Sequence, residues 1–244
     1  MTQNSQPLIQ PNGAITDTYL SLGTLSGQAT GRPLFREHPA SLLRTASGGI
    51  PLVARTSTDG GAAWSSESVI APDTGGGPAD IRCCLDAAVI APASGTMYAV
   101  WDGYGPGEPV TLASSADGGH WSAPVLVTPG DRPSIQHVNA AVAAYDGKVF
   151  VSYGTRDTAV DHGTFVQQQV SWSYDGGVTF GSALSLGPLS NLKYAAVAPV
   201  PFPGDYSGAS ETASRVTLVW CVSRRPRNLA QKYHQVLFAA VLRP

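Results

Sequence analysis

Pairs of short apolar runs, separated by polar turns, recur along the chain. In each pair an alternating apolar and polar run comes first, and a shorter apolar run follows the turn. The alternating runs cover 50–56, 109–114 and 165–172, and the runs that follow cover 68–71, 124–127 and 183–186. Alternation with a period of two is typical of a half-buried β-strand. The pattern therefore predicts three β-hairpins.

The three turns share one sequence. Ser-Thr-Asp-Gly-Gly-Ala-Ala-Trp at 57–64 recurs as Ser-Ala-Asp-Gly-Gly-His-Trp at 115–121 and as Ser-Tyr-Asp-Gly-Gly-Val-Thr-Phe at 173–180, with the aspartates 58 residues apart in both intervals. Glycine adopts a positive φ at little cost, aspartate accepts hydrogen bonds from turn amides, and the aromatic residue packs on the turn. The predicted structural residues of the turns are Asp59, Trp64, Asp117, Trp121, Asp175 and Phe180.

Two further strands precede the second and third hairpins. They are predicted at 86–91 and 97–102, and at 139–145 and 148–153. Four strands in each repeat of this length are typical of a β-propeller blade. We therefore expect one all-β domain over 1–244, a β-propeller of four-stranded antiparallel blades. The predicted blades cover 14–72, 80–129, 137–187 and 193–244, and the first contains a long insertion after 14–22.

Composition and charge narrow the class of protein. A hydrophobic fraction of 43% supports a buried core, and 27 glycines and 19 prolines suit many short strands joined by turns. A net charge of −2, with no basic run longer than Arg224-Arg225, argues against a nucleic-acid partner. No apolar stretch reaches the about 18 residues that a membrane span needs. The polar N-terminus, 1–13, lacks the pattern of a secretory signal.

The positions of the cysteines and histidines predict neither a transition-metal site nor a framework of disulfides. Adjacent Cys83 and Cys84, together with Cys221, favour buried thiols. The histidines show no paired metal-ligand spacing, so no metal centre is expected. They are His38, His120, His137, His162 and His234. A calcium ion on loop carboxylates remains an alternative.

The repeated turns resemble the Asp-box, or BNR repeat, of the sialidase superfamily. The segment Gly-Asp-Tyr-Ser-Gly at 204–208 resembles a late blade of bacterial sialidase-like proteins with a Gly-Asp-Tyr motif. The resemblance implies a six-bladed propeller in the extracellular or periplasmic space, with glycans as partners. About four blades are expected in this chain. Three explanations stay open: further blades are missing from this chain, copies of the chain associate to close the arc, or the N-terminal segment supplies a missing outer strand.

Blade topology predicts where a site would lie. If the strands of a blade are labelled A to D from the centre outward, the Asp-box turn joins C to D and shares one face with the A–B turn. The opposite face carries the B–C loops and the crossovers between blades, where ligand sites of propellers gather. Candidate polar residues in these loops are Asp80, Arg82, Asp102, Asp131, Arg132, Arg156, Asp205, Tyr206 and Arg224.

The resemblance also implies roles for these residues. A sialidase uses a carboxylic acid as proton donor, a tyrosine nucleophile assisted by a carboxylate, and arginines that clamp the substrate's carboxylate. Asp80 or Asp131 would be the acid, and Tyr206 with Asp205 the nucleophile and its partner. The clamps would be Arg82, Arg132, Arg156 and Arg224, with Arg36 faintly similar to the arginine of an early Arg-Ile-Pro signature. Asp102 and Trp101 are further candidates for sugar binding.

A non-catalytic alternative stands beside this one. Aspartates and arginines at blade edges commonly bond to neighbouring loops, and Gly-Asp-Tyr at 204–206 also suits a structural turn. The sequence therefore predicts a sialidase-like glycoside hydrolase acting on terminal sugars, with a carbohydrate-binding or protein-interaction propeller as the alternative.

Overall fold

A computed structural model of the chain describes residues 2–21, 51–72, 74, 80–82, 88–90, 94–103, 107–128, 132–204, 207–228 and 230–243. These residues form strands and two short 3₁₀ turns, η2 (Asp161–Gly163) and η3 (Leu192–Tyr194), and no α-helix occurs among them. None of the described segments is a helix long and apolar enough to cross a membrane.

The strands form four main sheets in chain order. The first sheet contains β1 (Thr2–Ile9), β2 (Ile15–Ser21), β3 (Leu52–Ser57) and β4 (Ser68–Ala71). The second contains β5 (Ala88–Ile90), β6 (Met97–Asp102), β7 (Val110–Ser115) and β8 (Val125–Leu126). The third contains β9 (Ile135–Tyr145), β10 (Lys148–Asp157), β11 (Phe165–Ser173) and β12 (Leu184–Asn191). The fourth contains β15 (Gly208–Thr212), β16 (Arg215–Ser223) and β17 (Gln235–Leu242), after a small hairpin of β13 (Ala196–Val197) and β14 (Pro201–Phe202).

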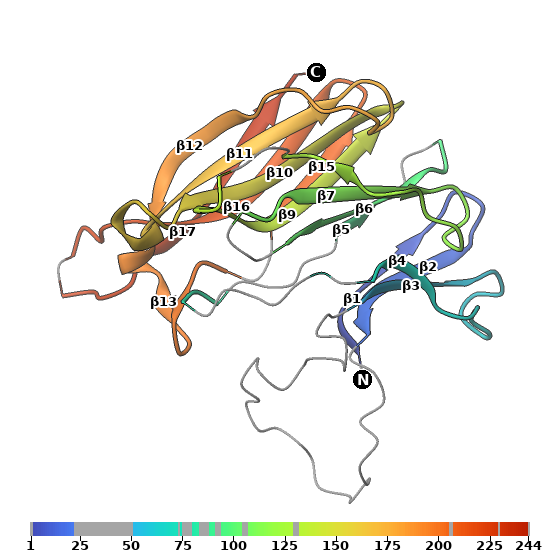
Figure 1. Cartoon of the computed structure of the whole chain (residues 1–244), viewed down its shortest axis with the longest axis horizontal. Coiled ribbons are helices and arrows are strands. Elements are labelled where there is room, and N and C mark those ends of the chain that lie inside the picture. The colour runs from blue at the N-terminus through green and yellow to red at the C-terminus, as the bar shows by residue number, and fades with distance from the viewer. Residues whose placement is uncertain are drawn as a thin grey trace, which may run out of the picture.

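Every strand pair is antiparallel, and each main sheet joins strands that follow one another in the chain. Successive sheets are arranged as an arc, running from the blue strands to the red strands in Figure 1. This is the architecture of a β-propeller built from antiparallel blades, as the repeat period predicts.

Buried apolar layers hold successive sheets together. Leu52 and Ala54 of the first sheet share a cluster with Ala99 and Trp101 of the second. A second cluster joins the second sheet to the third and includes Tyr98, Val100, Val142, Val151 and Tyr153. A third joins the third sheet to the fourth through Phe150, Val170, Leu218 and Trp220. The core is therefore divided among the interfaces between sheets, and each sheet contributes side chains from its faces.

The first strand departs from the sequence-based expectation. The first sheet begins at β1, earlier than the predicted start at Ala14. The sequence did not predict this strand because 2–9 lacks an apolar alternation. A tight turn, with Gly13 at φ 84° and the Asn12 side chain accepting from the N–H of Ala14, folds β1 back onto β2. The N-terminal segment therefore completes the first sheet and supplies no outer strand to the fourth.

Serine and aspartate side chains close all three Asp-Gly-Gly turns in a similar way. Ser57 Oγ donates to Asp59 Oδ1 at 2.8 Å and accepts from the N–H of Gly61 at 2.8 Å. Asp59 Oδ1 also accepts from the N–H of Ala63 at 2.9 Å. The third turn repeats this network through Ser173 and Asp175. In the second turn, which is one residue shorter, Ser115 Oγ accepts from the first glycine, Gly118, and Asp117 Oδ1 accepts from the N–H of His120. Hydrogen bonds to the ionised carboxylates lower the pKa of all three aspartates, and for Asp117 the largest cause is the hydrogen bond with the imidazole of His120.

The aromatic residues of the second and third turns pack at the interface with the preceding sheet. Trp121 lies against the cluster between the first and second sheets, and Phe180 lies against the cluster between the second and third. Trp64 is the corresponding residue of the first turn and is 41% exposed. The aromatic side chains of the second and third turns thus link successive sheets.

Candidate functional site

The loops predicted to carry a site lie at the end of the sheets opposite the Asp-Gly-Gly turns. Figure 1 shows the loop between β10 and β11 and the loop between β16 and β17 toward the left, whereas the β9–β10 turn lies at the right end of the same sheet. Backbone hydrogen bonds join loops of different sheets there. The N–H of Gly107 in the β6–β7 loop donates to the carbonyl of Ile135 at the start of β9 at 2.6 Å, and the N–H of Arg82 donates to the carbonyl of Pro201 at 2.9 Å. Segments far apart in the sequence therefore converge at this end.

Arg156 connects three of these segments. It lies near the end of β10, and only 2% of its surface is exposed. Its Nε donates to Gln136 Oε1 at 2.5 Å, its Nη1 to the carbonyl of Gly163 at 3.4 Å, and its Nη2 to Asp80 Oδ1 at 2.6 Å. The acceptors come from β9, from the β10–β11 loop and from the crossover between the first two sheets. The guanidinium group thus fixes the relative positions of the three segments.

The local sequence explains this geometry. Arg156 and Gln136 are directly paired residues of β10 and β9, so their side chains leave the sheet on the same face. A buried guanidinium group needs a counter-charge, and Asp80 supplies it. The side chain of Asp80 keeps 59% of its surface exposed, whereas that of Arg156 keeps 2%. The buried Arg156 guanidinium therefore fixes the position of the exposed Asp80 carboxylate.

The β10–β11 loop beside Arg156 has a strained backbone. Three consecutive residues, Asp161, His162 and Gly163, have φ values of 46°, 54° and 66°. Left-handed conformations are costly for residues with a Cβ and are found mainly where the surroundings impose them. A Cβ at Gly163 would lie 2.9 Å from Arg156 Nη1, so this position requires glycine. Asp161 and His162 are exposed at the end of the loop.

A second ion pair lies next to the first in sequence. Arg132 Nη2 donates to Asp157 Oδ2 at 3.0 Å, and the Arg132 side chain is 73% exposed. Hydrogen bonds from Ser134 and from the N–H of Ala159, followed by the charge of Arg132, lower the pKa of Asp157. Arg132 is thus an accessible cation that is already in contact with a carboxylate of its own chain.

Two more predicted arginines lie over aromatic rings. The Arg82 guanidinium carbon is 5.1 Å from the ring centre of Phe202, and that of Arg224 is 5.7 Å from the ring centre of Phe238. Both arginines are exposed. Cation–π contacts of this kind orient an arginine and leave its donors accessible.

Trp101 and Asp102 lie in the interior instead of on the loop surface. Trp101 is 7% exposed and packs between the first and second sheets, so its ring does not present a surface for stacking on a sugar. Asp102 has no exposed surface, and its Oδ2 accepts from the N–H of Ala140 at 3.2 Å. Both residues belong to β6, every residue of which is buried because neighbouring sheets cover both of its faces.

The structure therefore brings together only some of the predicted site residues. Asp80 and Arg156 are in direct contact, Arg132 is paired with Asp157, and Arg82 and Arg224 lie in exposed loops. The predicted residues Asp131, Asp205, Tyr206 and Arg36 lie outside the described residues, as do Cys83 and Cys84. Sequence reasoning assigned no role to Gly163, because only the conformation of the loop and the position of Arg156 reveal its importance.

The described part of the chain contains no cluster of three or more His, Cys, Asp or Glu side chains that could hold a metal ion. Cys221 on β16 is a half-buried free thiol whose pKa is raised by burial.

Comparisons with known proteins place the chain beside several solved structures. No family model matches the sequence, and no curated protein matches it. The chain is similar to the α-L-arabinanase of Penicillium chrysogenum complexed with arabinobiose, at 11% identity and a TM-score of 0.46, over 99% of this chain and 93% of that one. It is also similar to the GH93 α-L-arabinofuranosidase of Fusarium graminearum, at 14% identity and a TM-score of 0.48, over 98% and 62%. A GH43 protein of Bacillus licheniformis is 13% identical with a TM-score of 0.45, over 98% and 40%.

Proposed function

We propose that this chain is a sialidase-like glycoside hydrolase that acts on terminal sugars of glycans at the loop end of the propeller. The observation that carries the proposal is the exposed carboxylate of Asp80, held in place by the buried guanidinium of Arg156 where loops of several sheets meet. A carboxyl group positioned in this way can transfer a proton to or from a substrate at the surface. We therefore assign Asp80 to the acid–base role and Arg156 to positioning.

The exposed arginines of the loop end are positively charged and therefore favour an anionic sugar as substrate. Arg132, Arg82 and Arg224 are exposed and carry donors that match a carboxylate. We propose them as substrate contacts, with Tyr206 and Asp205 as nucleophile and partner, Asp131 as a second candidate acid, and Arg36 as a further clamp. The proposal also includes a single propeller domain over 1–244 and an extracellular or periplasmic location.

A carbohydrate-binding propeller without catalysis is the second candidate. It is favoured by the exposure of Arg132, Arg82 and Arg224, because guanidinium donors at the surface can bind a glycan without any catalytic group. This candidate predicts glycan binding that weakens in Arg132→Ala, with no release of sugar from any substrate.

Turnover of fluorogenic glycosides separates the two candidates. We expect the chain to release the fluorophore from an α-sialoside within a panel that also holds α-L-arabinofuranosides and β-xylosides. Asp80→Asn should reduce this release at least about 100-fold, because a general acid contributes roughly 10²–10⁴-fold.

The matched control is Asp146→Asn in the β9–β10 turn at the opposite end. Asn tolerates the φ of 49° found there, so the variant should fold and turn over substrate like the parent chain. Equal turnover in the parent and in Asp80→Asn, with both folded, would contradict the role of Asp80.

A further inference from the structure

Residues 80–82 of the crossover between the first two sheets are anchored at the loop end of the third sheet. Asp80 and Arg82 are exposed, whereas Ile81 between them is 3% exposed. Ile81 belongs to a buried apolar cluster that is separate from the three clusters joining successive sheets. The other members of this cluster are Val138 of β9, Val166 of β11, Leu192 of η3 and Ala195. The apolar side chain of this segment therefore packs on a sheet to which the segment does not belong.

Gly154 of β10 shapes the part of the cluster that comes from the third sheet. It pairs with Val138 next to a bulge in β9, where Asn139 has a φ of 53°. A Cβ at Gly154 would lie 2.8 Å from Val166 Cγ1 and 3.0 Å from Val138 Cγ2, so a side chain there would displace both valines. Glycine at this position therefore lets the two valines approach each other across β10 and pack in the cluster of Ile81.

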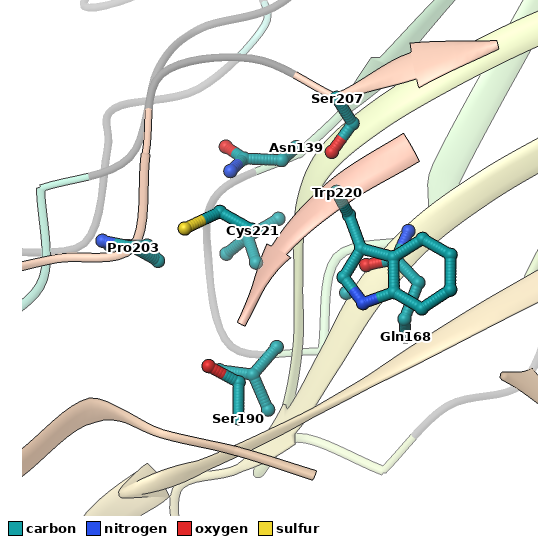
Figure 2. A pocket seen from close by; sticks show the side chains of 10 residues that line it. Asn139, Gln168, Ser190, Pro203, Ser207, Trp220 and Cys221 are labelled. Atoms are coloured by element: carbon teal, nitrogen blue, oxygen red, sulfur yellow. The ribbon is translucent and has the colours of Figure 1, made fainter. Parts of the chain in front are cut away.

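A small cavity borders the same two valines. Figure 2 shows Pro203, Trp220 and Cys221 around it, and its volume is about 20 Å³. Pockets that bind small molecules are typically about 300–1,000 Å³ in volume. This cavity is therefore too small for a sugar, and we assign the valines to the support of Ile81.

The two neighbours of Ile81 make polar contacts. Arg156 Nη2 donates to Asp80 Oδ1 at 2.6 Å, but the Asp80 side chain is 59% exposed, and solvent weakens an ion pair with an exposed member. The N–H of Arg82 donates to the carbonyl of Pro201 at 2.9 Å. The packing of Ile81 differs from these contacts, because it involves no polar group and depends on apolar area removed from water.

We propose that Ile81 is a positioning residue of the candidate site: its insertion into the apolar cluster fixes the main chain at Asp80 and so sets where the Asp80 carboxylate meets a substrate. The proposal rests on the proposed function, which gives Asp80 the acid–base role. Arg156 holds the carboxylate of Asp80, and Ile81 holds the backbone that carries it. A misplacement of about 1 Å in a catalytic group can lower the rate about 100-fold.

Steady-state kinetics with the glycoside that the parent chain turns over test this role. Ile81→Ala should lower kcat about 10- to 100-fold and leave KM within about twofold, because a misplaced proton donor weakens the transition state and not substrate binding. Ile81→Leu refills the cluster and should restore kcat to within about threefold of the parent value. The matched control is Leu186→Ala, which truncates a buried side chain between the third and fourth sheets and should keep the parent kcat.

A double variant shows whether Ile81 acts through Asp80. Adding Ile81→Ala to Asp80→Asn should change kcat by less than about twofold, because two residues that act through one group have non-additive effects. A folded Ile81→Ala variant with the parent kcat would overturn the proposal. So would an equal loss of kcat on adding Ile81→Ala to the parent and to Asp80→Asn.

Hydrogen exchange of the Arg82 amide, followed by NMR, gives a readout that needs no activity. Ile81→Ala should accelerate this exchange at least about tenfold, because the segment then opens more easily, whereas Leu186→Ala should leave it unchanged. If Ile81→Ala does not fold, Ile81→Val replaces it with a smaller effect in the same direction, and unchanged exchange counts against the proposal. A parent chain without turnover would contradict the proposed function instead, and the exchange alone then decides whether Ile81 anchors the segment.

Discussion

Arg156 shows how a single residue organises the loop end. Its charge is buried, and its three hydrogen bonds go to residues from three separate segments. The sequence predicted Arg156 as a candidate at the loop end but could not show that its donors point into the protein. A shift of one residue in a strand reverses the facing of every side chain, and only the pairing of β9 with β10 fixes it.

Replacing Arg156 by Met should destabilise the fold by about 2–4 kcal/mol, because Gln136 Oε1 loses its donor in a buried position and Asp80 loses its counter-charge. Chemical denaturation followed by tryptophan fluorescence measures the change. Arg215→Met, at an exposed position of β16, is the control and should cost less than about 1 kcal/mol. A similar loss of stability in both variants would contradict the role of Arg156.

Glu211 on β15 should make stability depend on pH. Burial raises the pKa of its carboxyl group from 4.5 to about 7, although the N–H of Ala144 donates to it, and Oε2 has no hydrogen-bond partner. The ionised form is therefore disfavoured in the folded state, so the chain loses stability as the pH rises from about 4.5 to about 7. Glu211→Gln should be more stable than the parent by about 1–2 kcal/mol at pH 8, after allowance for partial exposure.

The difference should disappear at pH 4, where Glu211 is protonated in both the folded and the unfolded chain. Urea denaturation at the two pH values measures it. A constant difference across this range would show that Glu211 does not titrate between the two states in the expected way.

At the scale of elements, the Asp-Gly-Gly hairpins were the most predictable feature. Their conformation depends on glycines, an aspartate and a serine within a few residues, so local chemistry is sufficient. β1 was not predicted, because its pairing with β2 relies on backbone hydrogen bonds and a turn at Gly13 instead of an apolar pattern. The bulge at Asn139 was also missed, since no residue type specifies an extra residue in a strand.

The aromatic residues of the turns should contribute unequally to stability. Trp121 packs against the cluster between the first two sheets, whereas Trp64 is 41% exposed. We expect Trp121→Ala to cost about 2–4 kcal/mol and Trp64→Ala less than about 1 kcal/mol. Thermal unfolding of the two variants under the same conditions gives the comparison, and equal losses would contradict the proposed link between successive sheets.

At the scale of the whole molecule, the last sheet presents an apolar edge. β17 pairs with β16 on one side only among the described strands, and its Leu237 and Val241 are 77% and 58% exposed. Exposed apolar strands at a sheet edge favour association with other chains. We therefore propose that copies of the chain self-associate through this sheet.

Sedimentation velocity over a range of protein concentrations tests this association. Leu237→Lys should shift the distribution toward the monomer, because a charged side chain on an edge strand opposes pairing. Val178→Lys introduces the same charge at a position that is 66% exposed in the third Asp-Gly-Gly turn, and should leave the distribution unchanged. A parent chain that is monomeric at every concentration would contradict the proposal.

The order of strands has a consequence for synthesis. Each main sheet is assembled from strands that are consecutive in the chain, so none has to wait for a strand made much later. Contacts between neighbouring segments form faster than contacts between distant ones, and domains fold as units while the ribosome is still translating. The first sheet can therefore be complete before the last is translated, and each newly made sheet emerges beside a finished surface on which to fold.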